Sequence, residues 1–65
     1  MTKYVHIVYV HPVENGEPNL HKVKKEIEFN VKEDADDYIR DRNSLTKSEQ
    51  AVYVGRVNDA TGELE

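Results

Sequence analysis

The chain has 65 residues, enough for one domain, and its 13 acidic and 9 basic side chains give a formal net charge of −4. This balance argues against a domain whose main work is to coat nucleic acid or an anionic membrane, because phosphate binding needs a basic surface. There is no cysteine, which excludes disulfides and thiolate metal sites and suits a reducing, cytoplasmic location. No segment approaches the ~20 apolar residues of a membrane span.

We expect a single domain over residues 1–63. The final Leu64-Glu65 dipeptide often precedes a purification tag, so residues 64–65 are a candidate cloning scar and receive no functional weight. So short a chain buries only about 60% of its unfolded surface. Small domains of this kind are often supported by a partner subunit, and we therefore expect this chain to bind one.

The first predicted strand covers residues 4–10, which are β-branched or aromatic almost throughout. Pro12 is expected to end it, because proline cannot donate to a central ladder. Asn15-Gly16 is the dipeptide best suited to a type I′ turn, since both residues tolerate positive φ. We therefore predict a hairpin connection over residues 12–19.

The returning strand is predicted from Leu20 to Phe29. Val23, Ile27 and Phe29 share one face by period two, while alternating lysines and glutamates occupy the solvated face. Lys25 falls on the apolar face, which indicates an edge strand or a nearby bulge.

A helix is predicted next. Asn30 is a candidate N-cap, and Glu33 three residues later completes a capping-box pattern. Arg42 lies near the expected end, before Asn43-Ser44. One apolar stripe at helical spacing is expected to face the sheet: Val31, Ala35, Tyr38 and Ile39.

Residues 50–57 are predicted to form the third strand, because Val52, Val54, Gly55 and Val57 are poor helix formers. A competing interpretation starts a second helix at Thr46, where Thr-Lys-Ser-Glu also fits a capping box. Residues 58–62 indicate a turn or a fraying tail.

These elements predict an α+β domain of ββαβ order. The expected sheet has three antiparallel strands in the order 2-1-3, with one helix packed on one face and the first strand in the centre. We expect Val5, Ile7 and Tyr9 to face the helix, although the first strand is apolar on both sides and the opposite parity stays open.

One helix covers one face only, so the other face is expected to expose an apolar stripe larger than a small monomer usually tolerates. The predicted interaction face is Tyr4, His6, Val8, Val10, Val52 and Val54. This predicts a non-enzymatic protein-interaction module that pairs with itself, as a homodimer, or with another protein.

An alternative function rests on the acidic residues of the predicted helix, which are Glu33, Asp34, Asp36, Asp37 and Asp41. Carboxylates on an exposed helix can imitate DNA phosphates and inhibit a nucleic-acid-binding protein. The ordinary interpretation is that acids near a helix N-terminus complement its dipole. A calcium loop is not indicated, because the positions that need Asp or Asn and Gly hold Tyr38 and Ile39.

A third hypothesis is a sheet that binds nucleic acid weakly. Lys22, Lys24 and Lys25, with Arg56, form a modest basic set, and Tyr4 offers an aromatic ring for stacking. The acidic balance opposes this hypothesis, and lysines on a solvated edge strand are its ordinary explanation.

No cofactor, metal or enzymatic activity is predicted. His6, His11 and His21 fall on the hairpin, but a zinc site normally needs three or four ligands, so hairpin and surface histidines are the preferred interpretation. Ser44 and Ser48 lack the Gly-x-Ser-x-Gly context of a nucleophile, and there is no glycine-rich phosphate loop.

Overall fold

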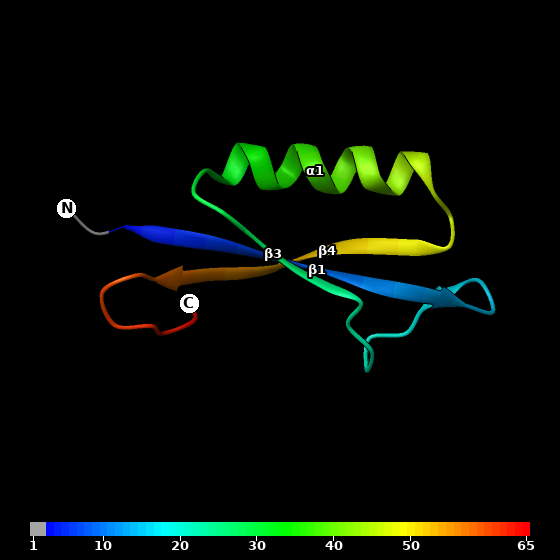
Figure 1. Ribbon diagram of the computed structural model, residues 1–65, viewed down its shortest axis with the longest axis horizontal. Coiled ribbons are helices and arrows are strands. Elements are labelled where there is room, and N and C mark those ends of the chain that lie inside the picture. The colour runs from blue at the N-terminus through cyan, green and yellow to red at the C-terminus, as the bar shows by residue number, and fades with distance from the viewer. Residues whose placement is uncertain (1–2) are drawn as a thin grey trace.

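The computed structural model describes residues 3–65 and contains one helix and an antiparallel sheet (Figure 1). The elements in chain order are β1 (Tyr4–Glu14), β2 (Glu17–Pro18), β3 (Lys25–Phe29), α1 (Lys32–Leu45) and β4 (Glu49–Asn58). The predicted α+β class is confirmed. Within residues 3–65, α1 is too short and too polar to cross a membrane.

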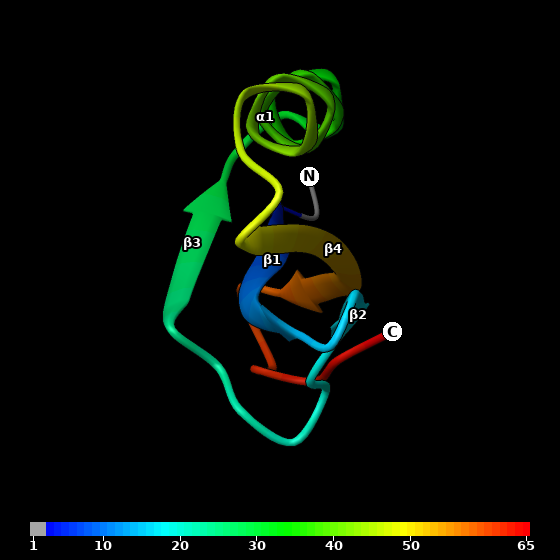
Figure 2. The same ribbon diagram turned by 90° about the vertical axis from the view of Figure 1, so that its right-hand side faces the viewer.

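The sheet is built around β1, which pairs antiparallel with β3 and with β4. Both partners pair with residues 6–10 of β1, so they lie on opposite edges of it, as Figure 2 shows. The short β2 pairs with the end of β1. The predicted central position of the first strand is therefore confirmed, and α1 lies above one face of the sheet (Figure 2).

The hairpin turn is the predicted one. Asn15 and Gly16 have φ values of 56° and 82°, the positive pair that a type I′ turn needs. Pro12, however, does not end the strand, because β1 continues to Glu14. β3 starts opposite Val10, so no β3 residue lies opposite Pro12 to need an amide donor from it.

The returning strand is shorter than predicted. β3 contains only residues 25–29, because residues 19–24 turn instead of extending. The Asn19 carbonyl accepts the Lys22 amide at 3.2 Å, and the Asn19 side chain accepts the His21 amide at 3.0 Å. Val23, predicted to face the core, is consequently exposed. The edge position that Lys25 indicated for this strand is confirmed, since β1 is the partner of β3 in the described sheet.

The helix begins without the predicted capping box. Val31 is the N-cap, with extended φ and ψ and no side-chain hydrogen bond. Glu33 and Asp34 lie in the first turn, where they complement the helix dipole. The helix also continues past Arg42 to Leu45. Of the predicted stripe, Ala35 is buried while Val31 is exposed.

The core lies between α1 and one face of the sheet. Its buried residues are Val8 and Val10 of β1, Ala35 of α1 and Ala51 of β4. Five larger side chains pack against them and are partly buried: Ile27, Phe29, Tyr38, Ile39 and Tyr53. The predicted parity is therefore wrong, because the even-numbered residues of β1 face the helix.

The last strand confirms the prediction for residues 50–57 and excludes the helix from Thr46. A bulge in β4 shifts its pairing, since Ile7 pairs with Gly55 whereas Val8 pairs with Tyr53. One extra residue reverses the side-chain alternation. Tyr53 therefore faces the helix and packs against the core, whereas Val57 pairs with Val5 and lies on the opposite face.

An ion cluster joins the end of α1 to the start of β4 and to Lys24, the residue before β3. One oxygen of Glu49 accepts from Arg42 at 2.7 Å, and the other accepts from Lys24 at 3.1 Å. The hydrogen bonds from Arg42 and then from Lys24 hold the pKa of the Glu49 carboxyl below its ordinary value of 4.5. The cluster therefore stabilises the fold more when Glu49 is ionised than when it is protonated.

The Glu49→Gln variant is expected to melt below the wild type at pH 7, with a gap that narrows as the pH falls. A lowered folded-state pKa contributes stability that is complete above the unfolded value and is lost as pH drops through the folded value. Thermal melts between pH 7 and pH 3 measure the gap. A gap that stays constant across this range would show that ionisation of Glu49 does not stabilise the fold.

The molecule is thin for its mass. Its radius of gyration is 12.6 Å, against about 10.7 Å expected for a compact chain of this length. Its accessible surface is 4869 Å², against about 4,200 Å² for a typical monomer of this mass. The excess follows from the two-layer build, in which α1 covers one face of the sheet.

Candidate interaction face

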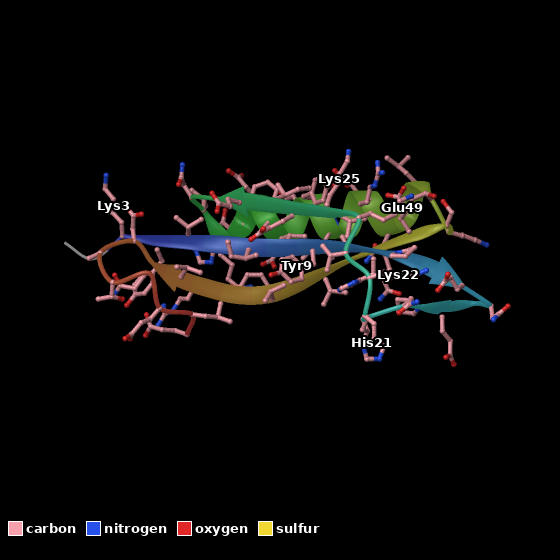
Figure 3. The ribbon with its side chains drawn as sticks, turned by 60° about the horizontal axis from the view of Figure 1, so that its bottom comes forward. Lys3, Tyr9, His21, Lys22, Lys25 and Glu49 are labelled. Atoms are coloured by element: carbon pink, nitrogen blue, oxygen red, sulfur yellow. The ribbon has the colours of Figure 1, made fainter. Side chains whose placement is uncertain are left out.

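The side of the sheet opposite α1, called here the far face, carries a row of apolar side chains. Figure 3 shows this side, with α1 behind the sheet and Tyr9 near its centre. The row, called here the apolar stripe, comprises Val5, Ile7, Tyr9, Val52, Val54 and Val57. It runs along β1 and β4 because these side chains alternate with the core residues and the β4 bulge brings Val57 to the same side.

Segments of the chain cover both ends of the apolar stripe. At one end Leu64 forms a bridge with Val57. At the other, residues 19–24 fold against His11, whose Nδ1 lies 2.6 Å from the Lys22 carbonyl oxygen. Between them lies a shallow hollow of about 350 Å³, which Ile7, Tyr9 and Val54 help to line. Ile7 is 5% exposed whereas Val54 is 37% exposed, so the part of the far face that no described segment covers is centred on Val54.

The border of this hollow is acidic. Glu26 and Glu28 of β3 line it beside Tyr9 and Ile7, their pairing partners on β1. Asp59, after the end of β4, lines it as well. No basic side chain of the described residues lines this hollow, so the local field favours a ligand with positive charge.

The structure divides the predicted interaction face between two sides of the sheet. Val8 and Val10 are fully buried beneath α1, so they cannot form an exposed face. His6 lies on the same side, with Nδ1 2.9 Å from the Tyr53 hydroxyl. The Tyr4 ring is covered by Arg56, whose guanidinium carbon lies 4.2 Å from the ring centroid.

Val52 and Val54 are the two predicted residues that do lie on the far face. The sequence pattern predicted Val5, Ile7 and Tyr9 on the helix side. The small side chain of Ala51 is the sequence feature that could have indicated which face of β1 meets the helix. A small side chain on β4 lets α1 approach the sheet, and Ala51 pairs with Val10, which places the even-numbered residues of β1 beneath the helix.

The acidic residues of α1 all lie on its exposed surface, and they are partly neutralised within the helix. Asp36 pairs with Lys32 at 3.0 Å and Asp37 with Arg40 at 2.8 Å. Glu33 and Asp34 occupy the first turn, and Asp41 is exposed. These contacts account for most of the acidic cluster as ordinary helix stabilisation.

The basic residues of the nucleic-acid hypothesis do not form one patch. Lys22 pairs with Glu14 at 3.7 Å and Lys24 with Glu49 at 3.1 Å. Arg56 is opposite His6, toward the other end of β1, and it covers the aromatic ring that was expected to stack on a base. The geometry therefore gives this hypothesis no support.

The three histidines are separated. His6 lies beneath the helix and His21 is exposed on the 19–24 segment. His11 lies on β1, within the hairpin as predicted, but it is 5% exposed and is therefore a buried histidine and not a surface one. Within residues 3–65, no three His, Asp or Glu side chains lie close enough together to hold a metal ion.

Comparison with protein-family models, with curated proteins and with solved structures finds no match for this chain.

Proposed function

We propose that this protein is a non-enzymatic interaction module that binds another protein through the apolar stripe of its far face. The observation that carries the proposal is the side-chain pattern of the sheet. Its two longest strands are apolar on the side without a helix, where an antiparallel sheet facing water normally carries polar residues. A partner that covers the stripe also adds burial to a domain with a small core.

The acidic border favours a different protein over a second copy as the partner. Two copies meeting by these faces bring Glu26, Glu28 and Asp59 of each copy into one contact region, and like charges in an interface are costly. A partner with apolar side chains flanked by lysine or arginine meets both features. The absence of cysteine suits a cytoplasmic setting for this contact.

The Val54→Lys variant is expected to lose the partner while keeping the fold, because Val54 is 37% exposed in the middle of the apolar stripe. A lysine there places a hydrated charge in the contact. Leu45→Lys is the matched control, since Leu45 is an 82% exposed apolar residue at the end of α1, away from the stripe. Quantitative crosslinking and capture in cells, followed by binding measurements on the purified pair, compares the variants.

The proposal predicts a partner retained by wild type and by Leu45→Lys, and lost by at least about tenfold in affinity, or roughly 1.4 kcal/mol, with Val54→Lys. Equal retention by both variants would contradict it. Sedimentation of the purified protein tests the homodimer. If the wild type self-associates and Val54→Lys does not, the stripe is still the interface, but its partner is a second copy of this chain.

A further inference from the structure

The outer edge of β3 is a second candidate binding surface. β3 pairs with β1 on one side, and in the described part of the chain its other side has no strand partner. Ile27 and Phe29 project from this edge strand toward the helix side, where the centroids of the Phe29 and Tyr38 rings lie 5.6 Å apart. Glu26 and Glu28 project toward the far face.

The hydrogen-bond pattern shows which backbone groups of this edge are free. The Val13 amide donates to the Ser48 carbonyl at 2.9 Å, on the β4 side of β1. Backbone groups alternate along a strand, so the odd-numbered residues of β1 bond toward β4 and the even-numbered residues toward β3. The Lys24 amide, which donates to the Val10 carbonyl at 2.7 Å, fits this phase.

The β3 partners of these even-numbered residues are Lys25, Ile27 and Phe29. The intervening residues of β3, Glu26 and Glu28, therefore direct their amide N–H and carbonyl groups away from β1. Two residues with unpaired donors and acceptors form the template that an added strand requires.

We propose that the β3 edge takes up an extended segment of a partner protein with alternating basic and apolar side chains. Side chains of an added strand that lie opposite Glu26 and Glu28 project to the far face, where lysine or arginine meets two exposed carboxylates. The alternate side chains project to the helix side, where apolar groups lie next to half-buried Ile27 and Phe29.

A second copy of this chain does not satisfy the edge. Antiparallel self-pairing through the free groups of β3 sets Glu26 opposite Glu26, Glu26 opposite Glu28, or Glu28 opposite Glu28 of the other copy. Like charges placed directly opposite each other are destabilising. The edge therefore selects against its own sequence and for a complementary one, and this selection is independent of the apolar stripe.

The test uses a short synthetic peptide of alternating lysine and valine, with a block-arranged peptide of the same composition as the control for charge alone. Fluorescence anisotropy measures binding, and amide hydrogen exchange of the wild-type protein locates it. The alternating peptide is expected to bind at least about tenfold more tightly than the block peptide. The Glu26 and Glu28 amides are expected to exchange more slowly on binding.

Two variants at one position separate backbone pairing from charge. Glu28→Gln removes the carboxylate, whereas Glu28→Pro also removes the outward amide while sparing the bonds to β1. The proline variant is expected to bind the peptide several-fold more weakly than the glutamine variant. The synthetic peptide stands in for the strand that pairs with β3 and does not depend on the far-face partner, so failure of the far-face proposal leaves this result unchanged.

Equal binding of the alternating and block peptides would overturn the inference, as would unchanged exchange at Glu26 and Glu28 in the bound wild-type protein. The exchange measurement needs no variant, so it decides the question even where Glu28→Pro does not fold. Slow exchange of both amides in the protein alone, together with a dimer in sedimentation, would also overturn it by making a second copy the occupant.

Discussion

Replacing Val10 with lysine is expected to unfold the domain at 25 °C. Val10 of β1 is fully buried in the core with Ala35 of α1 and Ala51 of β4. The substitution removes a buried apolar side chain and places an unpaired ammonium in the core. An unpaired buried charge costs several kcal/mol. A domain of this length has only about 3–10 kcal/mol of total stability, so the substitution removes most or all of it.

Val54→Lys is the control for this prediction, because it makes the same chemical change on the other face of the sheet. Val54 is 37% exposed, so its lysine reaches water and the expected loss of stability is below about 1 kcal/mol. Far-UV circular dichroism and thermal melts compare the two variants. A folded Val10→Lys variant that melts near the wild-type temperature would show that the even-numbered face of β1 is not the core.

The second large loss of stability is expected on substitution of Asn43, whose side chain hydrogen-bonds α1 to the edge of β4. Its side-chain oxygen accepts the Ala51 amide at 2.8 Å, and its side-chain nitrogen donates to the Ala51 carbonyl at 3.3 Å. Asn43→Ala leaves both backbone groups of Ala51 without this partner, at a cost of about 1–3 kcal/mol. For a domain of this size each kcal/mol lowers the melting temperature by about 4–8 °C.

Ser44→Ala is the matched control for Asn43→Ala. The Ser44 hydroxyl donates only to the Arg40 carbonyl within the same helix at 2.9 Å, and it is exposed, so its removal is expected to change stability by no more than about 0.5 kcal/mol. Asn43→Asp keeps the acceptor and loses the donor, and it is expected to melt between the two alanine variants. If Asn43→Ala and Ser44→Ala have the same melting temperature, the hydrogen bonds from Asn43 to Ala51 do not stabilise the fold as proposed.

Local patterns predicted the elements of the fold well. The β-branched run at residues 4–10, the Asn15-Gly16 turn and the valine-rich residues 50–57 each form as expected, because the preferences that specify them act between near neighbours. The central position of the first strand also followed, since a hairpin and one crossover leave few sheet orders.

The orientation of the sheet did not follow from local pattern. β1 is apolar on both faces, so its own alternation does not say which side meets the helix. Contacts between distant segments determine which face of β1 meets the helix. Ala35 and Ala51 are small enough to let α1 pack closely over Val8 and Val10. A single bulge near Gly55 then places Val57 on the opposite side from Tyr53, and strict period two does not anticipate that reversal.

This error of parity explains why two of the six residues predicted for the interaction face, Val52 and Val54, lie on the side without the helix. The expectation of an uncovered apolar face came from counting one helix against a strand apolar on both sides, and that count does not depend on parity. Val52 and Val54 lie on the uncovered side, whereas Val8 and Val10 are buried under α1. The alternation of the strand predicts Glu26 and Glu28 on a solvated surface. Only the pairing of β3 with β1 shows that these two side chains border the hollow.

The most direct test of which side of the sheet is open is methyl relaxation by a soluble paramagnetic agent in dilute protein. The valine methyls of the far face, Val54 above all, are expected to relax strongly, while those of Val8 and Val10 stay protected. Strong relaxation at Val8 and Val10, with protection at Val54, would contradict the account and restore the opposite face as the open one.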